Sequence, residues 1–186
     1  MGFFMNLIRL TVKAQQVVQS AIEIAQNYNN QVVEAEHVLA AIVQESGNVA
    51  ENVIKKTGGN FNAVNVKVVQ LLETLPKVIG TGLGNQQMSQ SLAKIFDVAA
   101  EEARNLKDDY VSTEHILLAL SNDKGKAGQL LRDNGITYKD ILNALKDIRG
   151  TQRVSSQNPE DTYQSLEKYG RDLNKLAKQG KLDPVI

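Results

Sequence analysis

Apolar side chains recur at helical spacing in two stretches of the chain. The first stripe is spaced i, i+1, i+4, i+8 and i+11 and consists of Val17, Val18, Ala21, Ala25 and Tyr28. The same spacing returns at an offset of 78 (95 − 17 = 78), at Ile95, Phe96, Ala99, Ala103 and Leu106. A stripe of this kind is typical of an amphipathic helix with one buried face. The pattern predicts one helix from about Thr11 to Tyr28 and a related helix that begins near Ser89.

The two stripes belong to an internal repeat. At this offset, nine of the 34 positions from 12 to 45 are identical in the two halves of the chain. The first-half members of these pairs are Ala21, Glu23, Ala25, Asn27, Val33, Glu36, His37, Leu39 and Ala41. The pair Glu36-His37 therefore returns as Glu114-His115. We interpret the chain as a duplicated globular unit, because the period is longer than that of the usual solenoid repeats.

Each repeat is predicted to contain four helices. In the first repeat, 11–75, the second helix begins near Glu34, the third ends at Gly58 and the fourth runs from Asn60 to Leu75. The second repeat, 89–150, follows the same order after a one-residue slip, and 76–88 connects the two. No stretch shows the alternation of apolar and polar residues that is typical of a strand. Since two short repeats are too small to fold separately, we expect an all-α fold in which they share one core.

A second boundary follows the repeats. Residues 151–162 are polar and read as a linker, and 163–186 have the pattern of a helix with a stripe of Leu166, Tyr169, Leu173 and Leu176. The repeats, 10–150, are thus predicted to be one domain.

Composition and charge exclude several classes of function. The chain has 21 basic and 21 acidic side chains, whereas proteins that bind nucleic acid or anionic membranes usually carry a cationic excess. It has no cysteine, so disulfides and zinc-thiolate sites are excluded. The apolar runs are shorter than the roughly 20 residues that a membrane span needs. We expect neither nucleic-acid nor membrane partners and a cytoplasmic location.

The repeated Glu-His pair allows three interpretations. A carboxylate can orient an imidazole base, and His37 and His115 could meet in a metal site. Adjacent residues of a helix do not face each other, however, and the His-Glu-x-x-His spacing of zinc enzymes is missing. A structural role at the start of each second helix requires both copies, whereas an active site does not. We therefore favour the structural role and predict no catalytic residue and no metal ligand.

The chain resembles the Clp N-terminal domain family over about residues 10 to 149. The resemblance is carried by "EHVLAAIV" and "EHILLALS", each after an amphipathic helix and before a Gly-capped pair of helices. The tail "YQSLEKYGRDLNKLAKQGKLDPVI" is similar to the segment before the first AAA+ module of ClpB-type disaggregases. This likeness implies two four-helix pseudo-repeats packed as one domain, with the helix at 163–186 leading into an ATPase module beyond the present sequence.

The resemblance also implies a function and a set of partners. The full-length protein would be a homohexameric, ATP-driven disaggregase that threads unfolded or aggregated polypeptides through its pore with a DnaK-type chaperone system. The present chain has no Walker motif, so we expect no enzyme activity and no cofactor in it, with ATP and Mg²⁺ bound in the ATPase modules. We expect the chain alone to be a monomer that recognises substrate. The alternative is an adaptor-docking domain of a ClpA- or ClpC-like protease unfoldase.

Seven residues are implied as a substrate-binding site. The family's polar set falls on Thr11 of "RLTVKAQ" and on Asp108 and Glu114 of "KDDYVSTEH". An apolar groove beside them would be lined by Phe96, Val98, Tyr110 and His115. Each polar assignment has a structural alternative, since Thr11 also suits an N-cap and Glu114 also suits a helix dipole. Phe96 falls on the apolar stripe and is equally suited to the core.

Overall fold

The computed structural model describes residues 10–45, 49–79, 86–150 and 152–159. The described part of the first repeat contains α2 (Val12–Asn27), α3 (Ala35–Gln44), α4 (Val49–Lys56) and α5 (Phe61–Glu73), and that of the second contains α6 (Gln90–Asn105), α7 (Thr113–Asn122), α8 (Lys126–Asp133) and α9 (Tyr138–Arg149). The all-α fold with four helices in each repeat is confirmed. The predicted helix at 163–186 lies outside the described residues, as do residues 1–9.

The helix ends follow from local sequence. Thr11 and Ser89 hold equivalent positions, and their side-chain oxygens accept hydrogen bonds from the third backbone N–H that follows, at 3.2 and 3.0 Å. Gly58 and Gly135 follow α4 and α8 with φ of 78° and 74°. Glycine adopts this left-handed conformation more readily than any other residue, so both helices end where the sequence predicts.

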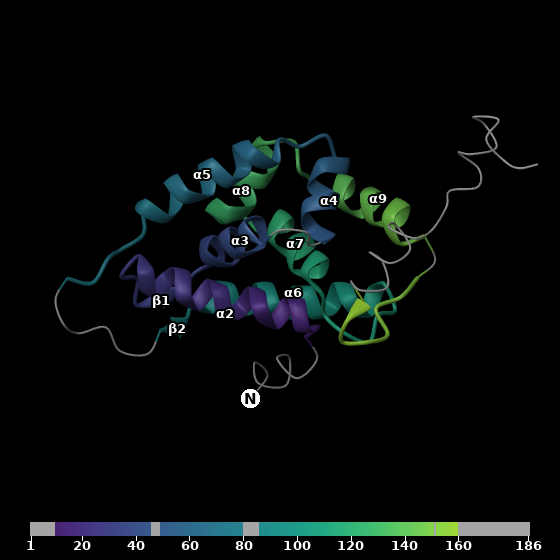
Figure 1. Ribbon diagram of the computed structural model, residues 1–186, viewed down its shortest axis with the longest axis horizontal. Helices are drawn as coiled ribbons and strands as arrows, with labels where there is room; N and C mark the ends of the chain where they lie inside the picture. Colours follow the sequence, from purple (N-terminus) through teal and green to yellow (C-terminus); the bar gives the residue numbers. More distant parts are fainter. Residues whose placement is uncertain (1–9, 46–48, 80–85, 151, 160–186) are drawn as a thin grey trace, which may run out of the picture.

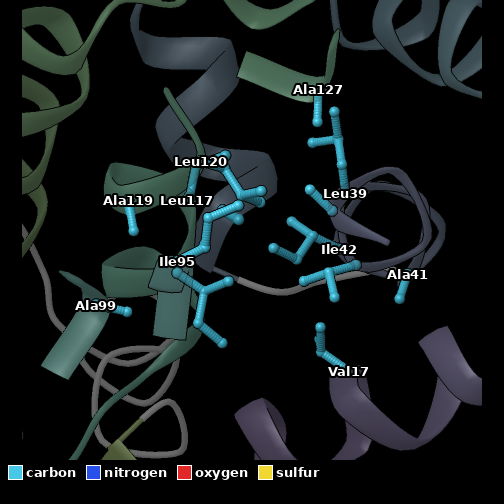
Figure 2. Packing of buried hydrophobic residues seen from close by; sticks show 14 of the residues in the cluster. Val17, Leu39, Ala41, Ile42, Ile95, Ala99, Leu117, Ala119, Leu120 and Ala127 are labelled. Carbon is cyan, nitrogen blue, oxygen red and sulfur yellow. The ribbon is translucent and has the colours of Figure 1, made fainter. Parts of the chain in front are cut away.

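The helices pack around two central members, α3 and α7 (Figure 1). Every residue from 35 to 43 and from 113 to 121 is buried. In Figure 1 the helices α2 and α6 lie along one side of this pair, and α5 and α8 lie on the other side. Figure 2 shows Val17, Ile42, Ile95 and Leu117 converging from both repeats on the same interior. The two repeats therefore share one core, as the sequence analysis expects.

Two short backbone pairings join the repeats. Strand β1 (Val32–Val33) runs parallel to β2 (Gln87–Met88), and Leu10 forms a parallel bridge to Val111. These pairings are related by the repeat, because the segment before the first helix of each half bonds to the loop before the second helix of the other half. The sequence pattern does not predict these pairings, since a two-residue strand has no detectable alternation.

Part of the predicted linker lies against the domain. The Val154 side chain is fully buried, and its carbonyl accepts a hydrogen bond from the Asp109 N–H at 3.0 Å. The Gln157 carbonyl accepts from the Val12 N–H at 2.9 Å, at the start of α2. Residues 152–159 thus pass beside the beginning of the first repeat.

Candidate functional site

The two histidines cap the starts of α3 and α7 in the same way. The Nδ1 atom of His37 accepts from the Glu34 N–H at 2.9 Å, and that of His115 accepts from the Ser112 N–H at 3.0 Å. A side chain at the third helical position that bonds back to the N-cap backbone completes a capping box, a place that glutamate or glutamine usually takes. The structural interpretation of the repeated pair agrees with this geometry.

The same hydrogen bonds fix the tautomer of both rings. Because Nδ1 accepts, the proton resides on Nε2. The Nε2–H of His37 donates to Asn30 Oδ1 at 3.0 Å, and the Nε2–H of His115 donates to Asp108 Oδ2 at 2.9 Å. Asn30 and Asp108 are themselves equivalent positions of the repeat (108 − 30 = 78). Burial lowers the pKa of His37 from 6.5 to about 4, so this ring is neutral near pH 7.

The second repeat adds a buried arginine to this arrangement. Arg149, at the end of α9, is 8% exposed, and Asp108 and Glu114 are 9% and 0% exposed. The Arg149 guanidinium donates to Asp108 Oδ2 at 2.6 Å and, through Nε, to Glu114 Oε1 at 3.0 Å. It also donates to the Ser112 hydroxyl at 3.3 Å. We call Asp108, Ser112, Glu114, His115 and Arg149 the polar cluster.

Both carboxylates of the polar cluster stay ionised. Burial alone would raise the pKa of Asp108, but hydrogen bonds from His115, Val154 and Arg149 lower it below its usual value. Burial likewise acts to raise the pKa of Glu114, but the Arg149 charge, together with the contributions of His115 and hydrogen bonds to the carboxylate, lowers that pKa below its usual value. Two carboxylates therefore share one guanidinium, and each side chain depends on the others for compensation.

The first repeat lacks this charge cluster at the equivalent positions. Asn30 replaces Asp108 there, and Leu72 takes the place of Arg149 at the offset of 77 that applies after the slip (149 − 72 = 77). Leu72 is fully buried. Glu36, the counterpart of Glu114, is 8% exposed, and burial raises its pKa. The capping histidine is thus common to both halves, whereas the polar cluster is particular to the second.

The structure separates the seven predicted site residues into four groups. Asp108, Glu114 and His115 meet in the polar cluster, and Thr11 lies at the join between the repeats, where its N–H donates to the Val111 carbonyl at 2.9 Å. Phe96 is 3% exposed and belongs to the core. Val98 and Tyr110 are half-buried. The role of all seven residues in substrate binding stays a prediction, and the buried ones could affect a ligand only through their neighbours.

Sequence reasoning missed Arg149, which connects the cluster. One signal could have identified it: Arg149 follows Ile141 and Leu145 at spacings of four residues and so falls on the apolar stripe of α9. A cation at such a position needs an anionic partner in the core. Its partners are 35 and 41 positions away in the sequence. The pattern therefore indicates that Arg149 needs an anionic partner but does not identify that partner.

A shallow cleft lies between α6 and α7 and includes one of the predicted groove residues. Its volume is about 240 Å³, and Val98, Ile95 and Ala119 supply its apolar lining. Asp123, Lys94 and Lys124 lie at the same cleft. An apolar floor with polar side chains around it suits a side chain of an extended peptide.

A wider hollow lies between α5 and α8. Its volume is about 680 Å³, and Leu71 and Leu130 are the apolar side chains among its lining residues. The Lys67 ammonium of α5 donates to Asn134 Oδ1, at the end of α8, at 2.8 Å. None of the seven predicted site residues lines this hollow, so it is a less suitable match to the predicted groove than the cleft beside Val98.

Three further observations describe the chemistry available in the described residues. Within the described ranges no group of three or more histidine and acidic side chains is placed to hold a metal ion. The two histidines are occupied by helix capping, and both are fully buried. No helix of the described segments has the length and apolar character to cross a membrane.

Comparison with known proteins defines the class. Residues 9–134 match the family described as the Clp repeat (R) N-terminal domain, and the chain belongs to this family. It is 39% identical over 184 residues to the chaperone protein ClpB of Bacillus cereus, in an alignment that covers 98% of this chain and 21% of that protein. ClpB of Bacteroides thetaiotaomicron is 38% identical over 182 residues. The chain is therefore of ClpB type and spans about a fifth of these relatives.

Solved structures agree with the fold. The Hsp104 N-terminal domain of Candida albicans superposes with a TM-score of 0.71 at 22% identity, covering 81% of this chain and 98% of that one. The N domain of ClpV in complex with a VipB peptide gives a TM-score of 0.64 at 16% identity, covering 83% and 93%. At this identity the likeness concerns the fold.

Proposed function

We propose that this domain recognises exposed apolar segments of unfolded or aggregated polypeptides and passes them to the ring of a ClpB-type disaggregase. The observation that carries the proposal is the cleft beside Val98, where apolar side chains of α6 and α7 line a hollow at the surface. The family membership supports it, as does a structural neighbour, the ClpV N domain, which was solved with a bound peptide.

The proposal extends to the complete protein. The hexamer, the cooperation with a DnaK-type chaperone and the use of ATP and Mg²⁺ belong to ATPase modules outside this chain. The domain itself acts as a monomeric, cytoplasmic recognition unit without enzyme activity. Docking of a protease adaptor on the same face is the alternative function.

The test uses a permanently unfolded protein, carboxymethylated lactalbumin, titrated into the isotopically labelled 186-residue chain. We expect amide shifts around Val98 and Ala119, and we expect Val98→Ser to weaken binding severalfold. Serine is a suitable replacement, because Ser20 occupies the equivalent position of the first repeat (98 − 78 = 20). Phe96 is unsuitable as a probe because it is a core residue.

The matched control is Val66→Ser. Val66 is 60% exposed on α5, so the substitution removes a surface valine that is not among the cleft's lining residues. Equal loss of binding in both variants, or no shifts at saturating substrate, would reject the cleft as a substrate site. In the second case adaptor docking becomes the better interpretation.

A further inference from the structure

A further pocket lies at the other end of α6, against α9. Its volume is about 200 Å³. The apolar part is made by Leu106, Leu142 and Leu145, and the basic part includes Lys107, Lys146 and Arg153. This pocket shares no lining residue with the cleft beside Val98. We call it the basic pocket.

The charges around the basic pocket are of one sign. Among the described residues that line it, none is acidic. Lys107, Lys146 and Arg153 are exposed, and none has an ion-pair partner within the stretches of chain that the structure describes. Arg149 also reaches the pocket, but Asp108 and Glu114 already compensate its charge. Three cations therefore remain available to an anion in solution.

The first repeat carries different side chains at these positions, although its backbone has the same left-handed conformation at the position equivalent to Lys107. Lys107 corresponds to Asn29, and both residues have a positive φ, 60° and 58°. Lys146 corresponds to Val69, and Leu142 corresponds to Asn65 (142 − 77 = 65). The fold thus requires neither lysine.

The backbone conformation of Lys107 also indicates that the fold does not require this lysine. Left-handed backbone favours glycine and asparagine, and other residues adopt it at a cost. Asparagine occupies this position in the first repeat, so the lysine is present in the second against the local preference. A residue in a disfavoured conformation next to a pocket is an indication of a role for its side chain.

Size and charge together define the ligand. Small-molecule sites usually measure about 300–1,000 Å³, so a pocket of about 200 Å³ suits a single residue of a longer chain. Three leucines would contact an apolar side chain, and the surrounding cations would contact carboxylates on either side of it. We propose that the basic pocket binds a protein segment in which acidic residues flank one apolar residue. This site is separate from the proposed substrate cleft and goes beyond it.

The test is a titration of the labelled 186-residue chain with the peptide acetyl-Glu-Glu-Leu-Glu-Glu-amide. We expect shifts at the amides of Lys107, Leu142 and Lys146, and affinity that falls as salt is added, because exposed ion pairs are screened. The triple variant Lys107→Ala, Lys146→Ala, Arg153→Ala should bind about tenfold more weakly, since exposed ion pairs contribute little individually but add up. Leu142→Asn, which introduces the first-repeat residue, should also weaken binding.

Two controls make the result decisive. Lys139→Ala removes an exposed lysine from the same helix outside the pocket and should leave affinity unchanged. The neutral peptide acetyl-Gln-Gln-Leu-Gln-Gln-amide should bind much more weakly. Absence of shifts at millimolar peptide, equal binding of the two peptides, or equal loss in the Lys139→Ala variant would overturn the proposal. Shifts confined to the amides around Val98 would also overturn it while supporting the substrate cleft.

Discussion

The backbone N–H of Val154 donates to Asp108 Oδ1 at 2.7 Å, although 46 positions separate the two residues. The other carboxylate oxygen of Asp108 accepts from both His115 and Arg149. One carboxylate therefore joins the capped start of α7, the end of α9 and the segment that leaves the domain. The polar cluster is a junction of three chain segments, and its members are expected to matter for more than local stability.

Truncation of Val154 should release the segment around it. The side chain is fully buried, and Val154→Ala removes two methyl groups worth about 0.8 kcal/mol each, which raises the population of the detached segment roughly 15-fold. We expect trypsin to cleave after Arg153 correspondingly faster, while the melting temperature of the domain changes little. The control Ser155→Ala alters an exposed neighbour and should leave cleavage unchanged. Unchanged cleavage of the Val154 variant would show that the contact does not hold the segment.

Removal of Arg149 should destabilise the domain strongly. Arg149→Met leaves the buried carboxylates of Asp108 and Glu114 without their counter-ion, and breaking a buried ion pair in this way costs about 3–5 kcal/mol. Urea unfolding measures the loss. Arg104→Met, which alters an exposed arginine on α6, should change the free energy of unfolding by less than about 0.5 kcal/mol.

A compensated variant distinguishes charge from packing. Arg149→Leu combined with Asp108→Asn and Glu114→Gln removes the unpaired charges and introduces the first-repeat residues at two of the three positions. We expect it to recover most of the stability, because apolar or neutral replacement of a whole buried ion cluster is often close to neutral. If the triple variant is as unstable as Arg149→Met, the cluster stabilises the domain through the packing of its side chains and not through their charges.

The stability of the domain should depend on the protonation of His37. Its pKa is about 4 in the folded state and near 6.5 in the unfolded chain, so between these values the unfolded state binds more protons. The free energy of unfolding should therefore rise with pH across this window, by at most about 1.4 kcal/mol per pH unit from this group. Denaturant unfolding of the wild type and of His37→Gln at several pH values isolates the contribution.

Glutamine is the appropriate replacement, because it can make the same bond to the N-cap backbone without titrating. The pKa of the Glu36 carboxyl is raised in the folded state, so its contribution to stability falls as the pH rises and opposes that of His37. Glu36 is present in both proteins. The difference between the two curves is therefore the informative quantity. Parallel curves would contradict a depressed His37 pKa, and an NMR titration of the ring would confirm the reason.

The two equivalent helix caps should contribute unequally. Ser89→Ala should cost about 1 kcal/mol, the usual value of a lost N-cap. Thr11→Ala should cost more, because Thr11 is also fully buried at the join between the repeats. Thr11→Ser keeps the capping oxygen and should recover the cap's share of the loss. Equal effects of the two alanine substitutions, measured by thermal unfolding, would mean that burial at the join adds nothing.

The sequence predicts the helices well because their signals are local. The apolar stripes, the polar caps and Gly58 and Gly135 place the helix ends within a residue or two of those observed. The structural role of the repeated Glu-His pair also follows from local geometry. The hydrogen-bond partner of His115 does not follow from local geometry. Nothing in the apolar stripes identifies Asp108 as the acceptor, although Asn30 and Asp108 are equivalent positions of the repeat.

What the sequence does not predict depends on contacts between distant segments. The parallel bridge of Leu10 and Val111 and the bonds of Val154 connect positions whose proximity only the packed fold creates. At 151–162 the polar composition predicts a linker, and it gives no sign that the Val154 side chain within this stretch is buried against the domain. The site residues chosen by resemblance include Phe96 and Glu114, which are buried; solvent exposure requires the structure.

The hydrogen bond between the Val12 N–H and the Gln157 carbonyl places the start of α2 next to residues 152–159, which follow the last helix of the domain. A pull on the departing chain would load this bond and the Val154 contacts one after another and would reach the helical core only after they part. Mechanical work done on the domain is therefore absorbed first by the contacts of Val154 and Gln157. Detachment of residues 152–159 would therefore leave the packing of the eight helices of the described segments in place.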